Sequence, residues 1–147
     1  MNIVIGSDHR GFTQKQYVQE HIKTVHGVTI HWLDIGTHND ERTDYPPYAL
    51  TACRYVLEGK ASFGVLLCGS GIGMAIAANR HRGIYAAVVW NERVAQLARA
   101  HDHANIIALP SDFIDNQEAV DIVCAALQTA PLPGRYAQRI KLIDQDL

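Results

Sequence analysis

Short runs of aliphatic and β-branched residues alternate along the chain with longer stretches whose apolar residues recur at helical spacing. The short runs predict five strands, at Asn2–Ile5, Thr29–Leu33, Phe63–Leu67, Ile84–Val89 and Asn105–Leu109. The longer stretches predict helices at about Gly11–Val25, Tyr48–Glu58, Ile72–Asn79, Glu92–Ala100, Asn116–Gln128 and Arg135–Asp144. The alternation is typical of βαβ units, so we expect an α/β fold: a Rossmann-like three-layer sandwich with a five-stranded parallel sheet and an extra C-terminal helix.

No repeat, low-complexity tract or linker divides the 147 residues, so we expect one domain spanning residues 1–147. The last predicted helix follows Pro131-Leu132-Pro133-Gly134, and no strand comes after it. That helix is therefore free to reach away from the sheet and to pack elsewhere, for example on a second subunit.

Composition narrows the function classes. A net charge of −2 gives no electrostatic case for a nucleic acid or a membrane surface as partner. The chain enters an apolar run directly after Met1 without a basic leader, and no apolar stretch is long enough to span a bilayer, so we expect a cytoplasmic protein. Three cysteines without Cys-x-x-Cys spacing argue against a disulfide framework or a zinc knuckle.

The segment from Val65 to Gly73 carries the strongest chemical signal. A buried apolar strand runs into Cys68 and then into three alternating glycines, Gly69, Gly71 and Gly73, before a predicted helix. Glycines let a backbone approach a ligand closely, and the amides at a helix start favour negative charge, which would also lower the pKa of the thiol. This pattern predicts an anion cradle that carries a nucleophile or base; by composition alone, Cys68 is as readily a small core residue, and Cys53 and Cys124 are expected in the core.

Two phosphate-binding interpretations fail on spacing. A dinucleotide fingerprint needs Gly-x-Gly-x-x-Gly after the first strand, whereas the glycines here follow the third and Met74 takes the place of the last one. A cysteine phosphatase loop needs an arginine at that same position. In a parallel sheet ligands bind beyond the carboxyl ends of the strands, so the polar residues of the loops are the other candidates, including Asp8, His9, Thr43 and Tyr45. His101, Asp102 and His103 stand at a helix end, before the fifth strand; two imidazoles without a third ligand do not make a metal site.

Taken in order, these segments resemble the type B ribose-5-phosphate isomerases, a family that also contains the galactose-6-phosphate isomerase subunits. The resemblance covers nearly the whole chain. It rests on Gly6-Ser7-Asp8-His9-x-Gly11-Phe12, Asp34-x-Gly36-Thr37, Glu41-Arg42-Thr43-Asp44-Tyr45-Pro46, Cys68-Gly69-Ser70-Gly71-Ile72-Gly73 with Ala77-Ala78-Asn79, His101 with Ala104-Asn105, and Gly134-Arg135 with Arg139.

The resemblance implies an aldose–ketose isomerase that works through a cis-enediolate without a cofactor or a metal. It implies Cys68 as the base, the amides of residues 69–73 as the oxyanion cradle, Ser70 at the position of a threonine that handles the hydroxyl proton, and His101 as the residue that opens the sugar ring. Asp8, His9, Thr43, Tyr45 and Asp102 would contact the sugar, and Arg135 and Arg139 would bind its phosphate with help from His9. Family sites are built by two subunits, which predicts a homodimer or a dimer of dimers.

The chain departs from the family pattern at three places. Asp102 replaces an asparagine, Pro110-Ser111-Asp112 replaces Gly-Ser-Arg, and Tyr85 stands where arginine is common. The change at Asp112 removes one arginine near the phosphate and reverses its charge, and Arg10, His81 or Arg82 are candidates to replace that positive charge. Ribose 5-phosphate is the simplest substrate. A six-carbon phosphate such as allose or galactose 6-phosphate would fit a site widened at Ser70 and Asp112, and a non-catalytic sugar-phosphate-binding subunit is the alternative from another class.

Overall fold

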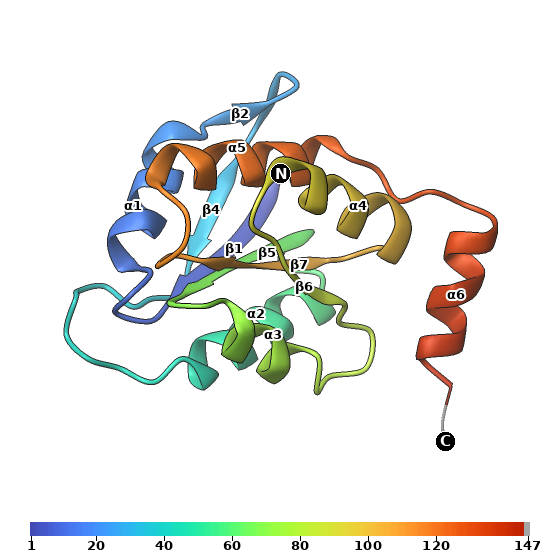
Figure 1. Ribbon diagram of the computed structural model, residues 1–147, viewed down its shortest axis with the longest axis horizontal. Coiled ribbons are helices and arrows are strands. Elements are labelled where there is room, and N and C mark those ends of the chain that lie inside the picture. The colour runs from blue at the N-terminus through green and yellow to red at the C-terminus, as the bar shows by residue number, and fades with distance from the viewer. Residues whose placement is uncertain (146–147) are drawn as a thin grey trace.

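Five parallel strands form the central sheet of the computed structural model, which describes residues 1–145 (Figure 1). Their order across the sheet is β4 (His31–Asp34), β1 (Asn2–Ser7), β5 (Phe63–Cys68), β7 (Ile106–Pro110) and β6 (Ala86–Val88). The three central strands consist of aliphatic residues that are buried on both faces, as expected of a parallel sheet between two helical layers. The structure thus confirms the predicted fold class.

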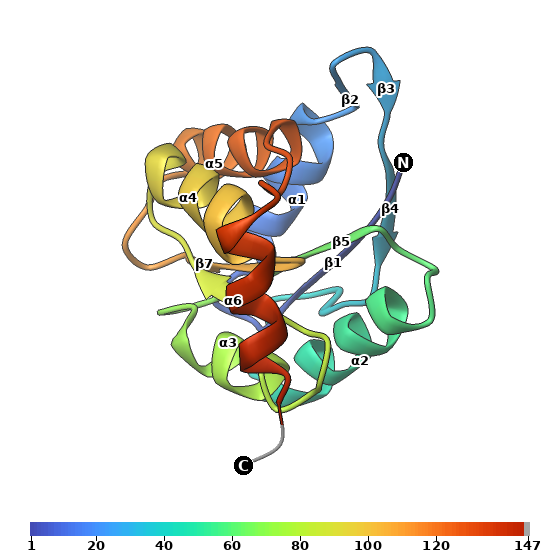
Figure 2. The same ribbon diagram turned by 90° about the vertical axis from the view of Figure 1, so that its right-hand side faces the viewer.

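Helices cover both faces of the sheet, as Figure 2 shows. One face carries α1 (Phe12–His21), α4 (Glu92–Asp102) and α5 (Asn116–Gln128), and the other carries α2 (Pro46–Leu57) and α3 (Ile72–Ala78). Successive residues of β1 alternate between the two cores: Ile3 and Ile5 pack under the first layer and Val4 under the second. No helix within residues 1–145 is long and apolar enough to cross a membrane.

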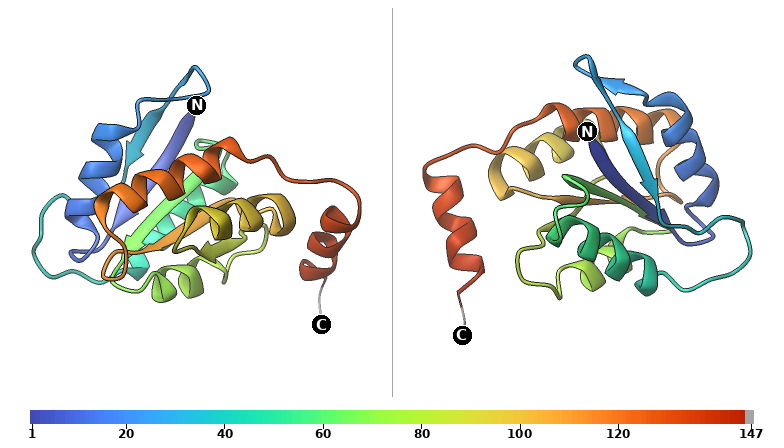
Figure 3. Two further views of the ribbon diagram at one scale, coloured as in Figure 1. Left: turned by 45° about the horizontal axis from the view of Figure 1, so that its top comes forward. Right: turned by 180° about the vertical axis from the view of Figure 1, so that it is seen from behind.

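The last helix, α6 (Arg135–Ile143), stands apart from both layers at one end of the sheet (Figure 3). The segment that leads into α6 is fixed to the end of α4, because the Leu132 amide donates to the Ala100 carbonyl at 2.9 Å. The His103 Nε2 also lies 2.8 Å from the Leu132 carbonyl oxygen. Residue Ile140 is buried, whereas Leu142 and Ile143 are 62% and 65% exposed. The expectation of a C-terminal helix that leaves the sheet is confirmed.

The predicted helix from Gly11 to Val25 is wrong at its end. Helix α1 stops at His21, and the next residues form a hairpin of β2 (Thr24–Val25) and β3 (Val28–Thr29). The two residues of its turn, His26 and Gly27, both have positive φ, of 48° and 75°, as the tight turn of a two-residue hairpin requires. The predicted strand from Thr29 to Leu33 is divided accordingly, because Thr29 belongs to the hairpin and β4 starts at His31.

The strand predicted at Ile84–Val89 is also shorter, since β6 covers Ala86–Val88 only. This strand lies at the edge of the sheet, and its outer side is occupied by a side chain: Asn79 donates to the Ala86 carbonyl at 2.8 Å and accepts from the Ala86 amide at 2.7 Å. The Asn79 side chain therefore takes the place of a neighbouring strand at that position.

A buried ammonium group anchors the loop that follows β4. Lys15 on α1 is 1% exposed, and its Nζ lies 2.5 Å from the Asp34 carboxylate and 2.8 Å from the Thr37 carbonyl. Asp34 also accepts from the Gly36 amide at 2.9 Å. These contacts fix the start of the loop of residues 35–45, which carries two of the predicted site residues.

The substitution Lys15→Ala should cost about 3 kcal/mol of folding free energy, because it leaves the Asp34 carboxylate half-buried without its cation. Urea unfolding of the variant beside the wild type measures this loss. Lys60→Ala is the matched control: the Lys60–Glu58 pair is exposed on both sides, and its loss should leave the midpoint nearly unchanged. Equal unfolding midpoints for Lys15→Ala and wild type would show that the contacts of Lys15 with Asp34 and Thr37 do not stabilise the fold.

Candidate active site

Three loops meet at the carboxyl edge of the central strands, because main-chain hydrogen bonds continue past the strand ends. The Asp8 amide donates to the Leu67 carbonyl at 3.2 Å, the Ser111 amide to Cys68 at 2.9 Å, and the Asp112 amide to Gly69 at 3.0 Å. Together with Tyr45 from the loop after β4, they line an open cavity of about 310 Å³. Its lining consists of Asp8, Arg10, Tyr45, Cys68, Gly69, Ser70, Gly73 and Asp112.

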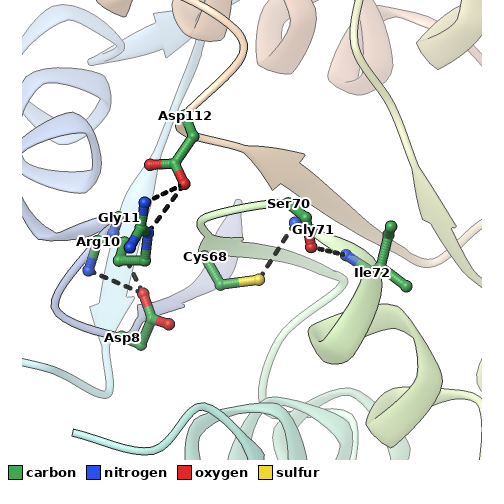
Figure 4. Close-up of polar contacts among 8 residues, drawn as sticks. All are labelled: Asp8, Arg10, Gly11, Cys68, Ser70, Gly71, Ile72 and Asp112. Atoms are coloured by element: carbon green, nitrogen blue, oxygen red, sulfur yellow. Dashed lines mark hydrogen bonds and ion pairs between the residues drawn. The ribbon is translucent and has the colours of Figure 1, made fainter.

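Cys68 is the last residue of β5 and is 4% exposed. Its Sγ accepts a hydrogen bond from the Gly71 amide at 3.2 Å (Figure 4). Burial raises the pKa of the thiol; the amides of Met74, Gly71 and Ser70 act in the opposite direction, and the nearby Asp8 carboxylate adds to the rise. The expectation that this turn lowers the pKa of the thiol is wrong, because the effect of burial outweighs that of the amides.

Ser70 and Tyr45 lie on either side of the same turn. The Ser70 hydroxyl accepts from the Ile72 amide at 3.3 Å, so it contacts the first residue of α3 while it lines the cavity (Figure 4). The Tyr45 ring lies against the backbone of Gly73, where an added Cβ would stand 2.6 Å from the ring's Cζ. A side chain at residue 73 would displace the tyrosine, and glycine there is what brings the ring into the cavity.

Asp8 and His9 fix the first loop. One carboxylate oxygen of Asp8 accepts from the amides of Arg10 and Gly11 at 2.9 and 3.3 Å, and the residue is 5% exposed. The His9 Nδ1 lies 3.3 Å from the Thr43 nitrogen and 3.2 Å from its carbonyl oxygen, and the Thr43 hydroxyl contacts the Tyr48 hydroxyl at 3.0 Å. The structure thus joins His9 and Thr43, which are far apart in the sequence, although neither residue lines the Cys68 cavity.

A second group of predicted site residues lies elsewhere. His101, near the end of α4, stacks on Tyr136 of α6 with ring centroids 4.4 Å apart. The Arg135 and Arg139 guanidinium groups lie 5.0 and 5.9 Å from the same ring, and Asp102 is the last residue of α4. Sequence reasoning missed Tyr136 as the centre of this group; its position beside Arg135 was the available signal.

The two groups stand at opposite edges of the sheet. Helix α4 leaves the carboxyl end of β6 and returns to the amino end of β7, so its last residues lie across the sheet from Cys68. Figure 1 shows α6 at that far end. Within the described residues, none of His101, Asp102, Arg135 and Arg139 lines the Cys68 cavity. Within one chain the predicted site residues therefore lie in two separate groups, which we call the Cys68 half-site and the Tyr136 half-site.

Two of the departures from the family pattern have partners in the structure. The Asp112 carboxylate pairs with Arg10 in the cavity, and the Tyr85 hydroxyl donates to the Asp144 carboxylate just beyond α6. Burial and this carboxylate raise the pKa of Tyr85 to about 12. Asp102, the third departure, is exposed at the Tyr136 half-site. Over residues 1–145, no three His, Cys, Asp or Glu side chains gather as metal ligands would.

Comparison with known proteins gives one consistent family. A family model described as Ribose/Galactose Isomerase matches residues 3–143. Ribose-5-phosphate isomerase B of Escherichia coli (strain K12) is 39% identical over 141 residues, which are 96% of this chain and 93% of that protein. Probable ribose-5-phosphate isomerase B of Mycoplasma genitalium is 39% identical over 144 residues, with 97% and 93% covered.

Solved structures agree with the sequence comparison. A ribose 5-phosphate isomerase from Thermotoga maritima superposes with a TM-score of 0.90 at 43% identity, and each chain is covered to 97%. The Mycoplasma genitalium enzyme, solved with bound ribulose-5-phosphate, gives a TM-score of 0.89 at 38% identity, with 97% of this chain and 93% of that chain covered.

The raised pKa of Cys68 predicts how its thiol reacts. Since the thiolate is the reactive form, alkylation of Cys68 by iodoacetamide should accelerate by up to about tenfold per pH unit between pH 7 and 9. Mass spectrometry of peptides from timed samples measures the rate, and Cys68→Ser removes the signal. Cys53 serves as an internal reference, because it is fully buried and its pKa is raised to about 11. A rate at Cys68 that does not change with pH would mean that the thiolate is already formed.

Proposed function

The chain belongs to the ribose/galactose isomerase family, and we propose that it interconverts ribose 5-phosphate and ribulose 5-phosphate through a cis-enediolate, with Cys68 as the base and without a metal ion. As a member of this family it is an aldose–ketose sugar-phosphate isomerase, an intramolecular oxidoreductase. The observation that carries the finer proposal is the Cys68 thiol, which lines the cavity and accepts a hydrogen bond from the Gly71 amide.

Proton transfer between carbons 1 and 2 of the sugar is the step that needs a base. In the proposal the Cys68 thiolate removes the proton from carbon 2 of the aldose and returns it to carbon 1. The negative charge that develops on the sugar oxygens is held by the amides of residues 69–73, which are fixed in place by the start of α3. The same amides stabilise the thiolate, and they oppose the effect of burial on its pKa.

Two further groups handle protons on oxygen. Ser70 has its hydroxyl in the cavity, where it accepts from the Ile72 amide and keeps its own proton for exchange with a substrate hydroxyl. His101 opens the furanose ring in the proposal, and its stacking on Tyr136 fixes the orientation of the imidazole. Asp8, His9, Thr43 and Tyr45 then line the sugar beside Cys68.

The phosphate is bound by Arg135 and Arg139 of a second subunit, with His9 assisting. The two arginines are four residues apart and flank the same Tyr136 ring, so they present two guanidinium groups on one face of α6. Asp102 lies on the same half-site and contacts the sugar.

A homodimer, or a dimer of dimers, follows from the position of the two half-sites. Since His101 and the arginines lie across the sheet from Cys68 in one chain, a complete site needs a second copy. Exposed aliphatic side chains accompany both half-sites: Ile72 and Ile76 on α3 are 55% and 62% exposed, and Leu142 and Ile143 end α6. Such clusters are typical of surfaces that associate.

The six-carbon alternative loses one of its two supports. A longer sugar would fit because Asp112 is shorter than arginine, but the Arg10 side chain also lines the cavity and pairs with Asp112 there. The five-carbon substrate therefore remains the proposal. The protein of Mycoplasma genitalium, similar in fold and 38% identical, was solved with ribulose-5-phosphate.

The central test is turnover of purified protein with a panel of pentose and hexose phosphates, each in the presence of EDTA. Ribose 5-phosphate should be the best substrate, and chelation should leave its rate unchanged. Cys68→Ala should lower kcat at least about 100-fold while phosphate binding persists, because a general base acts on the transition state. Near wild-type turnover of that variant would remove Cys68 as the base, turnover restored only by a divalent ion would overturn the metal-free mechanism, and no turnover of any sugar phosphate would favour the non-catalytic alternative.

Shared sites predict complementation between two inactive variants. In a hybrid dimer of Cys68→Ala and His101→Ala chains, one site combines the intact Cys68 of one chain with the intact His101 of the other. An equimolar mixture, dissociated and reassociated at random, should regain about a quarter of wild-type activity. Each variant treated alone is the control. No gain over the separate variants would place Cys68 and His101 in sites that a single chain completes.

A further inference from the structure

Arg10 and Asp112 form an ion pair at the mouth of the Cys68 cavity (Figure 4). The Arg10 Nε donates to Asp112 Oδ2 at 2.8 Å, and one terminal nitrogen donates to the same oxygen at 2.5 Å. The two side chains come from loops that are 102 residues apart in the sequence and meet because β1 and β7 flank β5. They remain 55% and 36% exposed, so the pair faces the space that a ligand would enter.

The pair packs against the backbone of Gly69, the residue that follows Cys68. A Cβ added to Gly69 would lie 2.7 Å from Arg10 Nε and 2.7 Å from Asp112 Oδ2, which no real Cβ tolerates. Glycine at residue 69 therefore lets the guanidinium and the carboxylate rest directly on the backbone next to Cys68. Hydrogen bonds from main-chain amides also fix the two loops that carry the pair. The Arg10 amide donates to the Asp8 carboxylate, and the Asp112 amide donates to the Gly69 carbonyl.

We propose that Arg10, oriented by Asp112, binds the phosphate of the substrate in the Cys68 cavity. This inference rests on the proposed sugar-phosphate function and extends it to a residue from the first loop. The arginine that the family pattern places at position 112 is thereby relocated: its charge comes from Arg10, and the residue at position 112 supplies the carboxylate that holds it.

The donor pattern of the cavity supports phosphate as the ligand of Arg10. Among residues 1–145, Arg10 is the one lysine or arginine that lines this cavity. Its ion pair occupies two N–H groups on one edge of the guanidinium, and an arginine has five, so the remaining donors match the oxygens of a phosphate. The Asp8 oxygen that accepts from two amides is already compensated, and Asp112 is compensated by Arg10 itself.

Asp112 acts as a positioning residue. A free arginine side chain loses considerable rotamer freedom when it binds an anion, and a carboxylate that already holds it removes part of that loss. The carboxylate therefore lowers the net positive charge that Arg10 presents to a phosphate, but it fixes the geometry of the guanidinium donors.

Calorimetric titration of inorganic phosphate into the full-length protein tests the proposal without requiring turnover. Arg10→Ala should weaken phosphate binding about tenfold or more, and Asp112→Asn about threefold, since a charge-assisted contact is lost outright in the first and only its geometry in the second. The double variant Arg10→Ala with Asp112→Arg returns an arginine to the family position and should recover most of the affinity. Arg93→Ala, on the exposed first turn of α4, is the matched control and should bind as the wild type does.

Each other result contradicts a stated part of the proposal. If Arg10→Ala binds phosphate as tightly as the wild type does, the proposal is overturned. If that variant also has a raised KM for the sugar phosphate, Arg10 contacts a sugar hydroxyl instead. Tighter binding by Asp112→Asn would make Asp112 a competitor for Arg10 and not its positioning residue. Arg10→Lys keeps the charge and covers the case in which the alanine variant does not fold: it should bind phosphate with intermediate affinity, and wild-type affinity would exclude a role for the guanidinium fork.

Failure of this inference and failure of the proposed function look different. If the wild type isomerises ribose 5-phosphate but Arg10→Ala binds phosphate normally, only the inference fails. If no sugar phosphate is turned over but Arg10→Ala loses phosphate, the anion site stands and the proposed isomerisation fails.

Discussion

The main-chain hydrogen bonds between β1, β5 and β7 are the interaction on which the candidate site depends. They do not stop where the strands stop: Asp8 bonds to Leu67, and residues 111 and 112 bond to Cys68 and Gly69. Three loops that carry the reactive groups are therefore held in register by the same ladder that holds the sheet. Because the backbone is fixed, the fold determines both how deeply the Cys68 thiol is buried and how closely the amides approach its sulfur. Burial raises the pKa of the thiol and the amides lower it, so both effects are consequences of the fold.

The second constraint is the direction in which a connecting helix runs. A helix that connects two neighbouring parallel strands must run back along the sheet, so the end of α4 cannot lie at the edge where the strands end. The imidazole of His101 and the arginines of α6 are placed by this rule at the far side of the chain, gathered around Tyr136. Division of the candidate residues between two edges is thus a property of the topology, and exposed aliphatic residues lie on α3 and on α6.

Local patterns predicted the elements well where local chemistry defines them. The helix at Asn116–Gln128 was predicted to the residue, and the structure shows a capping box there, in which Asp115 and Glu118 each bond to the other's backbone amide. The hairpin at residues 24–29 was missed because Thr24 and Val25 were joined to the preceding helix, although Gly27 between two β-branched runs marked the turn. The Arg10–Asp112 pair and the strand order were beyond prediction, since both depend on which distant segments become neighbours. The separation of His101 from Cys68 within one chain follows from the same topology.

The contact between Asn79 and Ala86 bears on whether the sheet can be extended past β6. An edge strand with free amide and carbonyl groups invites another strand to extend the sheet, and continuous sheets across subunits arise in that way. Here both outward polar groups of Ala86 are already bound by one side chain, which has no further strand to offer. Ala86 therefore has no outward main-chain group left for a neighbouring strand, and the sheet could extend at this residue only if the Asn79 side chain were displaced.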